Sequence, residues 1–326
     1  MLALAAAGHR TLAAGERGLV LYSDDCGTRW TQASVPVSMT LTALQFVDPR
    51  QGFAVGHGGV VLASRDGGEN WTRQLDGRRI AQLALAAAKQ KAAADGAAAD
   101  GQLADAERLV ADGPDKPLLA MHFWTAERGI VVGAYGIALT THDGGEHRNW
   151  IADRIPNPKG LHLYGQWVDG DQLVIVGEQG FAVRSNDGGG HFEALKTPYA
   201  GSYFGVTGLP GAASAELLVY GLRGHAYRSP VKGAAAFEPL NVGTEASVLS
   251  VLPVSADEAL AFDADGQIFD VHAAANRSML VGSSPVGPVL AAVPACGGTV
   301  VAGMRGLAVL DPGQRSAGQE KAASVK

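Results

Sequence analysis

A pair of glycines separated by two residues, Gly-x-x-Gly, recurs along the chain at a nearly constant spacing. The first positions of successive copies lie 41, 77, 44, 44, 42 and 40 residues apart, so one interval holds an insertion and the others agree. Recurrence at a period of about 40–50 residues is typical of an array of similar structural units. The copies are Gly15–Gly18, Gly56–Gly59, Gly133–Gly136, Gly177–Gly180, Gly221–Gly224, a degenerate Asp263–Gly266, and Gly303–Gly306.

Each unit reads as four short strands. In the second unit, apolar runs at 44–47 and 52–55 flank a turn, and a third run at 60–63 follows the glycine pair. Runs rich in Val, Leu and aromatics that alternate with turn residues indicate strands rather than helices. Four strands in each unit predict the blade of a β-propeller. We therefore predict an all-β chain, a seven-bladed β-propeller that forms a single domain over residues 1–312.

A second motif, Ser-x-Asp-x-Gly-x-x-Trp, follows the third run of the early units. Its aspartate can accept backbone N–H bonds inside a hairpin corner, and its glycine can take a positive φ. An active site needs one acid rather than several equivalent acids around a ring, so we assign these carboxylates a structural role. The motif is the Asp-box, or bacterial neuraminidase repeat. Its copies are Ser23, Asp25, Gly27, Trp30; Ser64, Asp66, Gly68, Trp71; Thr141, Asp143, Gly145, with an aromatic, Trp150, two residues late; and Ser185, Asp187, Gly189, Phe192.

Composition limits the classes of function that fit this chain. Its 326 residues are 47% hydrophobic, which is enough to bury a large core. Only 18% are charged, and the net charge of −6 argues against a sequence-independent nucleic-acid binder. No apolar run approaches the roughly 20 residues that cross a bilayer. The histidines and cysteines lack metal-ligand spacing, so we expect no metal and no cofactor.

The two cysteines, Cys26 and Cys296, fall in the first Asp-box and in the seventh unit. Blades one and seven are neighbours in a closed ring, which makes a disulfide conceivable. We nevertheless favour two free thiols, because an outer hairpin corner and an inner-strand turn are expected to lie too far apart for a bridge.

Both ends of the chain contribute to the predicted closure of the ring. The apolar start, residues 1–8, is short and lacks a basic segment, so we assign it to the inner strand of blade one rather than to a signal peptide. The seventh unit supplies three strands. Propellers commonly complete one terminal blade with a segment from the other terminus, and we expect that segment to precede residue 1. Without it, blade seven has three strands. Residues 313–326 are predicted to be a disordered polar tail.

The long interval between the second and third glycine pairs contains an alanine-rich insertion at residues 76–116. Ala, Gln, Lys and Leu favour helix, and Asp95-Gly96 can end a first segment, which predicts a helical hairpin after blade two. We favour a surface decoration or a semi-ordered linker. A partner-binding arm and a lid on the channel remain alternatives.

The residues inside the glycine turns should form a ring on one face of the propeller, together with the connectors that lead into each new blade. Arg and Tyr most often anchor a recognised partner, and Arg suits a carboxylate in a bidentate geometry. We expect Arg17, Arg223 and Arg305 to grip an acidic group or a chain terminus, which requires Arg17 and Arg305 to share a face. The other residues expected to contact a partner are His57, Lys116, Tyr135, Lys159, His162, Tyr164, Glu178, Tyr199 and Tyr203.

The glycine turns, the Asp-boxes and the run Phe-Ala-Val-Gly-His-Gly-Gly-Val-Val-Leu-Ala-Ser-Arg-Asp-Gly-Gly-Glu-Asn-Trp at 53–71 resemble the photosystem II stability/assembly factor family. The insertion after blade two makes the chain most similar to the non-photosynthetic bacterial members. The resemblance implies a non-catalytic scaffold that binds a protein or peptide, periplasmic or otherwise extracytoplasmic, and acts as an assembly or stability factor for a membrane protein complex. It implies a partner that is a membrane protein segment or a chain terminus, and a propeller that does not itself span the membrane.

An enzyme is the alternative. Sialidases share the Asp-box, but the resemblance would imply six blades, an Arg triad, a Tyr nucleophile paired with a Glu, and an Arg-Ile-Pro motif ahead of the first blade. This chain has seven units, and its Arg154-Ile155-Pro156 lies mid-chain. The alternative function is therefore that of a sialidase-like glycoside hydrolase or a carbohydrate-binding propeller. Glycosidases need two carboxylates about 5–10 Å apart, for which Glu178 and Asp265 are the candidates.

Overall fold

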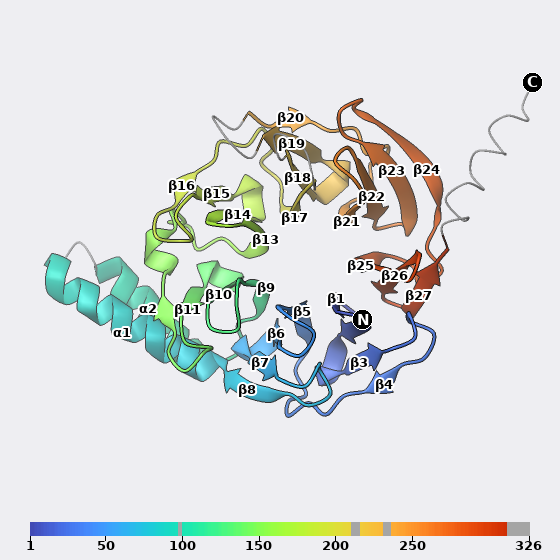
Figure 1. Ribbon diagram of the computed structural model, residues 1–326. Coiled ribbons are helices and arrows are strands. Elements are labelled where there is room, and N and C mark those ends of the chain that lie inside the picture. Colours follow the sequence, from blue (N-terminus) through green and yellow to red (C-terminus); the bar gives the residue numbers. More distant parts are fainter. Residues whose placement is uncertain (97–99, 210–215, 231–235, 312–326) are drawn as a thin grey trace, which may run out of the picture.

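The computed structural model describes residues 1–96, 100–209, 216–230 and 236–311. Within these ranges the chain forms seven antiparallel sheets arranged around one central axis, which confirms the predicted seven-bladed β-propeller (Figure 1). In each sheet the strands pair in chain order from the innermost to the outermost. Six sheets have four strands, and the described part of blade seven has three. The predicted polar tail at 313–326 and residue 312 lie outside the described residues.

The strands divide among the blades as follows. Blade one has β1 (Ala3–Ala7), β2 (Arg10–Ala14), β3 (Val20–Ser23) and β4 (Thr31–Gln32), and blade two has β5 (Leu41–Phe46), β6 (Gly52–Gly56), β7 (Val61–Ser64) and β8 (Thr72–Leu75). Blade three has β9 (Leu118–Phe123), β10 (Gly129–Gly133), β11 (Ala138–Thr141) and β12 (Asn149–Trp150), and blade four has β13 (Leu163–Asp169), β14 (Gln172–Gly177), β15 (Ala182–Ser185) and β16 (Glu193–Ala194). Blade five has β17 (Tyr203–Gly208), β18 (Glu216–Gly221), β19 (Ala226–Pro230) and β20 (Glu238–Pro239), and blade six has β21 (Val248–Pro253), β22 (Glu258–Asp263), β23 (Gln267–His272) and β24 (Arg277–Ser283). Blade seven has β25 (Val289–Ala295), β26 (Gly298–Gly303) and β27 (Gly306–Leu310).

The hydrophobic core lies between neighbouring blades rather than at one centre. The second strand of a blade is covered on both faces by the adjacent sheets, so β6 and β10 are buried along their whole length. Between blades two and three the rings of Phe53 and Phe123 stack with centroids 3.6 Å apart. Continuous apolar runs, rather than alternating ones, therefore mark these strands in the sequence.

In blades one to five, the glycine turn is a short 3₁₀ turn between the second and third strands. Its third residue adopts the left-handed region, with φ of 55° at Arg17, 56° at Tyr135 and 57° at Arg223. The last glycine then has positive φ and packs against backbone: a Cβ on Gly18 would lie 2.0 Å from the carbonyl oxygen of Val37. Only glycine fits there, which explains the repeat in the sequence.

The degenerate turn of blade six replaces this glycine geometry with a buried carboxylate. Asp263 Oδ1 accepts hydrogen bonds from the backbone N–H groups of Asp265 (3.0 Å) and Gln267 (2.8 Å). The Thr244 hydroxyl donates to its Oδ2 at 2.8 Å. An aspartate side chain thus holds the turn that glycine holds elsewhere.

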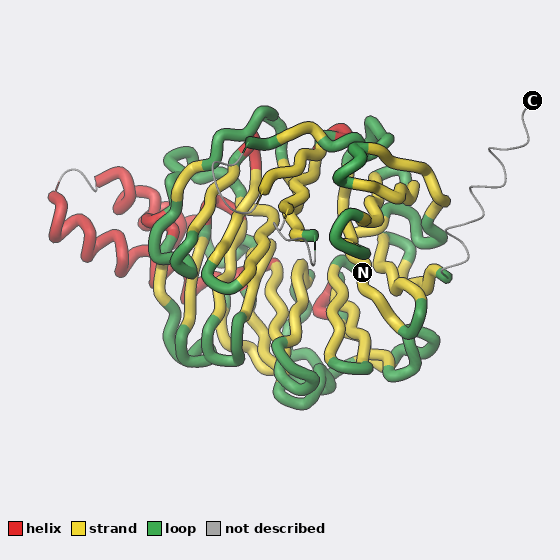
Figure 2. The backbone as a smooth tube through the Cα atoms, turned by 45° about the horizontal axis from the view of Figure 1, so that its top comes forward, coloured by secondary structure: helices red, strands yellow, loops and turns green. Residues whose placement is uncertain are grey.

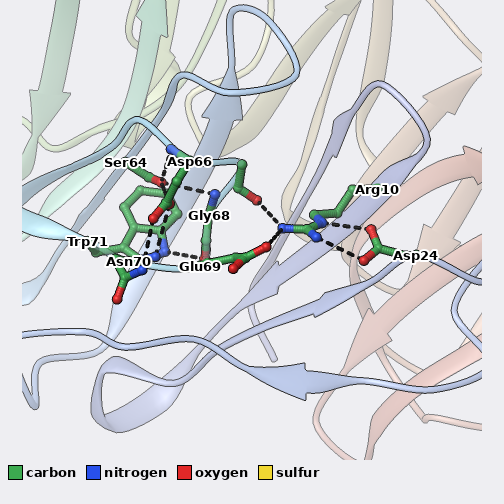
Figure 3. A network of polar contacts seen from close by, with 9 residues as sticks. Arg10, Asp24, Ser64, Asp66, Gly68, Glu69, Asn70 and Trp71 are labelled. Atoms are coloured by element: carbon green, nitrogen blue, oxygen red, sulfur yellow. Dashed lines mark hydrogen bonds and ion pairs between the residues drawn. The ribbon is translucent and has the colours of Figure 1, made fainter.

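The Asp-box carboxylates lie inside the hairpin turns between the third and fourth strands, at the end of each sheet opposite the glycine turns. Figure 3 shows the box of blade two. In blade two, Ser64 Oγ donates to Asp66 Oδ1 and accepts from the Gly68 N–H, both at 2.9 Å. Asp66 Oδ1 also accepts the N–H of Asn70 at 3.0 Å, and Trp71 Nε1 donates to the Gly68 carbonyl oxygen at 2.9 Å. The bond from the Ser or Thr hydroxyl to the aspartate and the bond from a backbone N–H to the aspartate recur in the boxes of Asp25, Asp143 and Asp187. The repeated carboxylates therefore serve the fold.

Trp150 is not the aromatic of the third Asp-box. Arg148 takes that place, three residues after Gly145 like Trp71 after Gly68, and it is buried with its Nη2 donating to Gln74 Oε1 at 2.9 Å. Burial lowers the pKa of Arg148 to about 10. Trp150 lies in β12 and packs instead against the helical insertion.

The insertion forms two helices, α1 (Gly77–Asp95) and α2 (Asp100–Asp112), as predicted. Figure 2 shows this arm projecting from one side of the disc. Asp76 caps α1 by accepting the N–H of Arg79 at 3.1 Å. Among the described residues, no helix is both long and apolar enough to cross a membrane.

The ring closes between blades seven and one, where the structure corrects the expectation of two free thiols. Cys26 and Cys296 form a disulfide with their Cα atoms 5.7 Å apart. The blade-one Asp-box folds across the boundary, so that Gly27 lies against Val300 and Val309 of blade seven. Positive φ at both cysteines, 63° and 39°, turns the two loops toward each other. The outer corner thus reaches the inner-strand turn, which sequence spacing did not reveal.

Candidate functional site

The glycine turns gather on one face of the disc, which we call the turn face. Each turn joins the second and third strands of its sheet, and the inner strands of neighbouring blades pack side by side in the same sense. Arg17 and Arg305 belong to the adjacent blades one and seven and therefore share this face. Arg223 lies on it in blade five, and all three arginines are exposed.

The three turn-face arginines have no ion-pair partner among the described residues. On the Asp-box face, by contrast, Arg10 spans blades one and two, with bonds of 2.7 and 2.8 Å to Asp24 and 3.0 Å to Glu69 (Figure 3). The bond to Asp24 raises the pKa of Arg10. Arg128 of blade three similarly approaches Asp171 of blade four at 3.3 Å. Arg10 and Arg128 therefore join blades, whereas Arg17, Arg223 and Arg305 keep their guanidinium groups available.

A path of aromatic contacts crosses blades three to five on the turn face. It begins at Tyr135, which is 59% exposed at the tip of its glycine turn. The Tyr135 and His162 rings meet edge-on with centroids 4.8 Å apart, and His162 lies 6.0 Å from Tyr164. Tyr164 in turn meets Phe204 at 6.2 Å. The path therefore offers apolar ring surface with polar atoms at its edges.

Charged groups flank Tyr135 and His162. Lys116 Nζ lies 5.4 Å from the centre of the Tyr135 ring, and its side chain is only 12% exposed because Asp112 and Asp115 surround it. The bond to Asp115 raises the pKa of Lys116. Glu178 accepts the backbone N–H of His162 at 3.2 Å and lies 3.4 Å from its ring Nδ1. These carboxylates hold their neighbours in place on the turn face.

A second aromatic stack lies in blade five beside Arg223. Tyr199 stacks on His225 with centroids 3.7 Å apart, and His225 stacks on Tyr227 at 6.3 Å. The Tyr199 hydroxyl reaches the Leu222 carbonyl oxygen at 3.4 Å. The sequence reading missed His225 and Phe204. Two features of the sequence could have indicated them. His225 directly follows Gly224 of the glycine turn, and Phe204 occupies the same position in its strand as Tyr164 does in β13.

Tyr203 requires a correction, because it does not reach the surface. It is completely buried at the start of β17 and packs with Val174, Val219 and Tyr227. Burial raises the pKa of Tyr203 to about 12. Tyr203 pairs with Gly221 as Leu163 pairs with Gly177, which makes it the core residue of its strand rather than a partner contact.

The remaining predicted residues are scattered around the same face. His57 is exposed in the turn of blade two, and Lys159 is exposed in the connector between blades three and four. In the described ranges, no three His, Cys, Asp or Glu side chains gather as a metal site requires.

Comparison with known proteins supports the family resemblance. The family model described as "Photosynthesis system II assembly factor YCF48" matches residues 7–92, which run from blade one into α1. This match confirms the resemblance to photosystem II assembly factors. No curated protein sequence matches the chain significantly.

Solved structures share the architecture at low sequence identity. YCF48 from Cyanidioschyzon merolae is 15% identical, with a TM-score of 0.66 over 96% of this chain and 95% of that chain. A chain described as "Crystal Structure of Mitotic Checkpoint Complex" is 11% identical, with a TM-score of 0.66 over 95% of this chain and 90% of that one. At these identities the likeness shows the fold alone. A structure of YCF48 bound to D1 peptide is 16% identical over 86% of this chain and 95% of that one, with a TM-score of 0.43.

Proposed function

We propose that this chain is a non-catalytic propeller that recognises a protein or peptide on its turn face. The main support is that three exposed arginines share one face with the aromatic path from Tyr135 to Phe204. These arginines, Arg17, Arg223 and Arg305, form no ion pair with any residue that the structure describes. A guanidinium can bind a carboxylate through two parallel hydrogen bonds, and tyrosine supplies ring surface with a hydroxyl. Such a surface suits a polypeptide that carries an acidic group or its own carboxyl terminus.

We further propose that the chain assists the assembly or stability of a membrane protein complex. The family model that matches residues 7–92 describes an assembly factor, which supports a role in binding another protein. A partner segment would lie across the rings of Tyr135, His162 and Tyr164, while its acidic groups pair with the arginines.

An extracytoplasmic location is part of the proposal. The Cys26–Cys296 disulfide supports it, because disulfides persist in oxidising compartments such as the bacterial periplasm and are rare in the cytosol. Fractionation of cells that express the full gene, with a protease-protection assay, tests this location directly.

The test of the binding face compares two triple variants in a pull-down from detergent-solubilised membranes of the native organism. One variant replaces Arg17, Arg223 and Arg305 with alanine. The matched control replaces Arg29, Arg50 and Arg65, which are exposed in the Asp-box-face loops, with alanine. We expect a protein that the wild type and the control both capture and that the turn-face variant loses. Equal capture by both variants would contradict the proposed face.

Hydrolysis assays address the enzymatic alternative. The proposed function predicts no turnover of chromogenic glycosides by the purified protein. Turnover that disappears in Glu178→Gln would instead support a glycosidase.

A further inference from the structure

A groove of about 570 Å³ separates the helical arm from blade three and the connector that follows it. Helices α1 and α2 form one wall, and Ile137, Trp150 and Ile155 contribute to the other. Tyr135 and Lys116 also line it, so the groove opens beside the aromatic path of the turn face. Volumes of about 300–1,000 Å³ are typical of sites that hold small ligands or short segments.

Short side chains keep this groove open. Ala84 and Ala88 of α1 and Ala106 of α2 are buried where the arm packs, and the half-buried Leu109 and Trp150 lie beside them from the two opposite walls. Alanine methyl groups allow the two helices to approach each other without filling the space toward the blade. The distance between the arm and blade three therefore determines the width of the groove.

The root of the arm is held tightly, which makes the groove preformed. A Cβ on Gly59 would lie 2.8 Å from the Gly77 Cα and from Ile80 Cδ1, and one on Gly77 would lie 2.6 Å from the carbonyl oxygen of Pro114. Ile80 is itself buried. Backbone contacts of this kind restrict the motion of α1 at its first turn. The wall of the groove is therefore preorganised, and binding does not require the wall to become ordered.

The rim of the groove carries charged groups of both signs, and among the described residues Lys159 and Asp153 are the two that form no ion pair. Arg108 approaches Asp105 at 3.8 Å, and Lys116 approaches Asp112 at 3.7 Å. Lys91 bonds to Asp95 at 2.9 Å. That bond raises the pKa of Lys91, and the charge of Asp153 across the groove adds to the effect. Lys159 is exposed on the rim and has no ion-pair partner among the described residues.

We propose that this groove is a second subsite for the same partner, and that it takes a short peptide segment with aliphatic side chains and one acidic residue. This inference rests on the proposed function. The aliphatic groups would cover Ala87, Leu109 and Trp150, which line the groove and are half-buried. The carboxylate would pair with Lys159, which is exposed and has no ion-pair partner among the described residues. The partner chain would then continue past Tyr135 onto the turn face.

The test uses a defined probe, the acetylated and amidated peptide Gly-Leu-Ala-Leu-Asp-Leu-Ala-Gly, and its matched peptide with Asn in place of Asp. Binding is measured by isothermal titration calorimetry at low salt. Ala87→Arg places a bulky side chain on the groove wall, and Lys159→Glu reverses the rim charge. Lys89→Glu, exposed on α1 but outside the groove, is the matched control. Thermal melts check that each variant is folded.

We expect saturable binding of the Asp peptide to the wild type and to the control. Binding should weaken at least tenfold in Ala87→Arg and in Lys159→Glu. The Asn peptide should bind the wild type at least tenfold more weakly than the Asp peptide, and it should lose no further affinity in Lys159→Glu. This non-additivity would identify Lys159 as the partner of the carboxylate.

Three results would overturn the groove subsite: no binding of the probe, binding that is unchanged in Ala87→Arg, or independent losses from the peptide and Lys159 changes. None of them bears on the turn face, because the arginine pull-down reports that site separately. If the pull-down succeeds and the probe fails, the turn face stands and the groove subsite falls.

Discussion

Removing the Cys26–Cys296 disulfide should lower the stability of the propeller without changing its fold. The bond joins residues that are 270 positions apart, so it closes a loop that contains most of the ring. The chain-entropy estimate for a loop of that length is about 5–6 kcal/mol at 25 °C, whereas typical disulfides supply about 2–4 kcal/mol. The native contacts between blades seven and one, including Leu4, Ala13 and Val300, remain in the reduced protein. We therefore expect a loss of about 2–6 kcal/mol in the free energy of unfolding.

The corresponding change in Tm follows from chain length. With an unfolding entropy of about 2.1 cal/mol/K per residue, the Tm of this 326-residue chain should fall by about 3–9 °C. The assay is differential scanning calorimetry of the wild type and of the Cys26→Ser/Cys296→Ser variant, each with and without dithiothreitol. Reduction should move the wild type to the Tm of the variant and should leave the variant unchanged.

Two observations would refute this reasoning. One is a native wild-type protein, purified under oxidising conditions, whose two thiols both react with Ellman's reagent after denaturation. The other is a Tm that agrees within about 1 °C between the oxidised wild type and the double variant, which would mean that the loop-closure entropy does not act on this ring.

Three further predictions follow from buried side chains and from the root of the arm. Trp71→Ala should lower the free energy of unfolding by about 3–5 kcal/mol, because Trp71 is 4% exposed and meets Phe46 edge-on. Urea unfolding measures this loss, and a loss under about 1 kcal/mol would contradict the prediction. Capture of the partner at low temperature should persist in this variant. Gly59→Ala should detach the start of α1, because φ of Gly59 is +64° and the new Cβ meets Gly77 and Ile80. Hydrogen exchange should then become faster in α1 but not in β6. Unchanged exchange in α1 would contradict the tight packing of α1 against the glycine turn of blade two. Burial lowers the pKa of His122 to about 4 from its usual 6.5. Between these pH values, His122 is protonated in the unfolded state but neutral in the folded state. The free energy of unfolding should therefore fall as pH drops from about 6.5 to 4. His122→Gln should flatten that part of the stability profile, and parallel profiles for wild type and variant would exclude His122 as the cause.

Much of the fold was predictable because its determinants are local. The glycine turn needs a positive φ and a missing Cβ within four residues, as Gly18 shows against Val37. The Asp-box needs a serine and an aspartate that bond to groups two and four residues away, as Ser64 and Asp66 do. Such short-range requirements leave a mark on the sequence at every repeat, and counting the marks yields the number of blades.

The candidate site was predictable only in outline. Arg17, Arg223 and Arg305 could be placed because their turns are part of the repeat. Tyr199 and Tyr203 look alike in the sequence, yet one stacks on His225 at the surface and the other is buried in the blade core. Strand register separates them, and the connector before β17 is too irregular for its register to be read from residue types.

The propeller, the two faces of the disc and the helical insertion could all be inferred from residue order alone, because repetition and helix propensity act over short stretches of chain. Three features became visible only in the folded molecule: the bond between Cys26 and Cys296, the packing of Trp150 against the arm while Arg148 takes its place in the Asp-box, and the groove beside the arm. Each of these depends on how far a loop reaches across the boundary between two blades. That reach is set by packing between segments distant in the chain, and no local pattern encodes it.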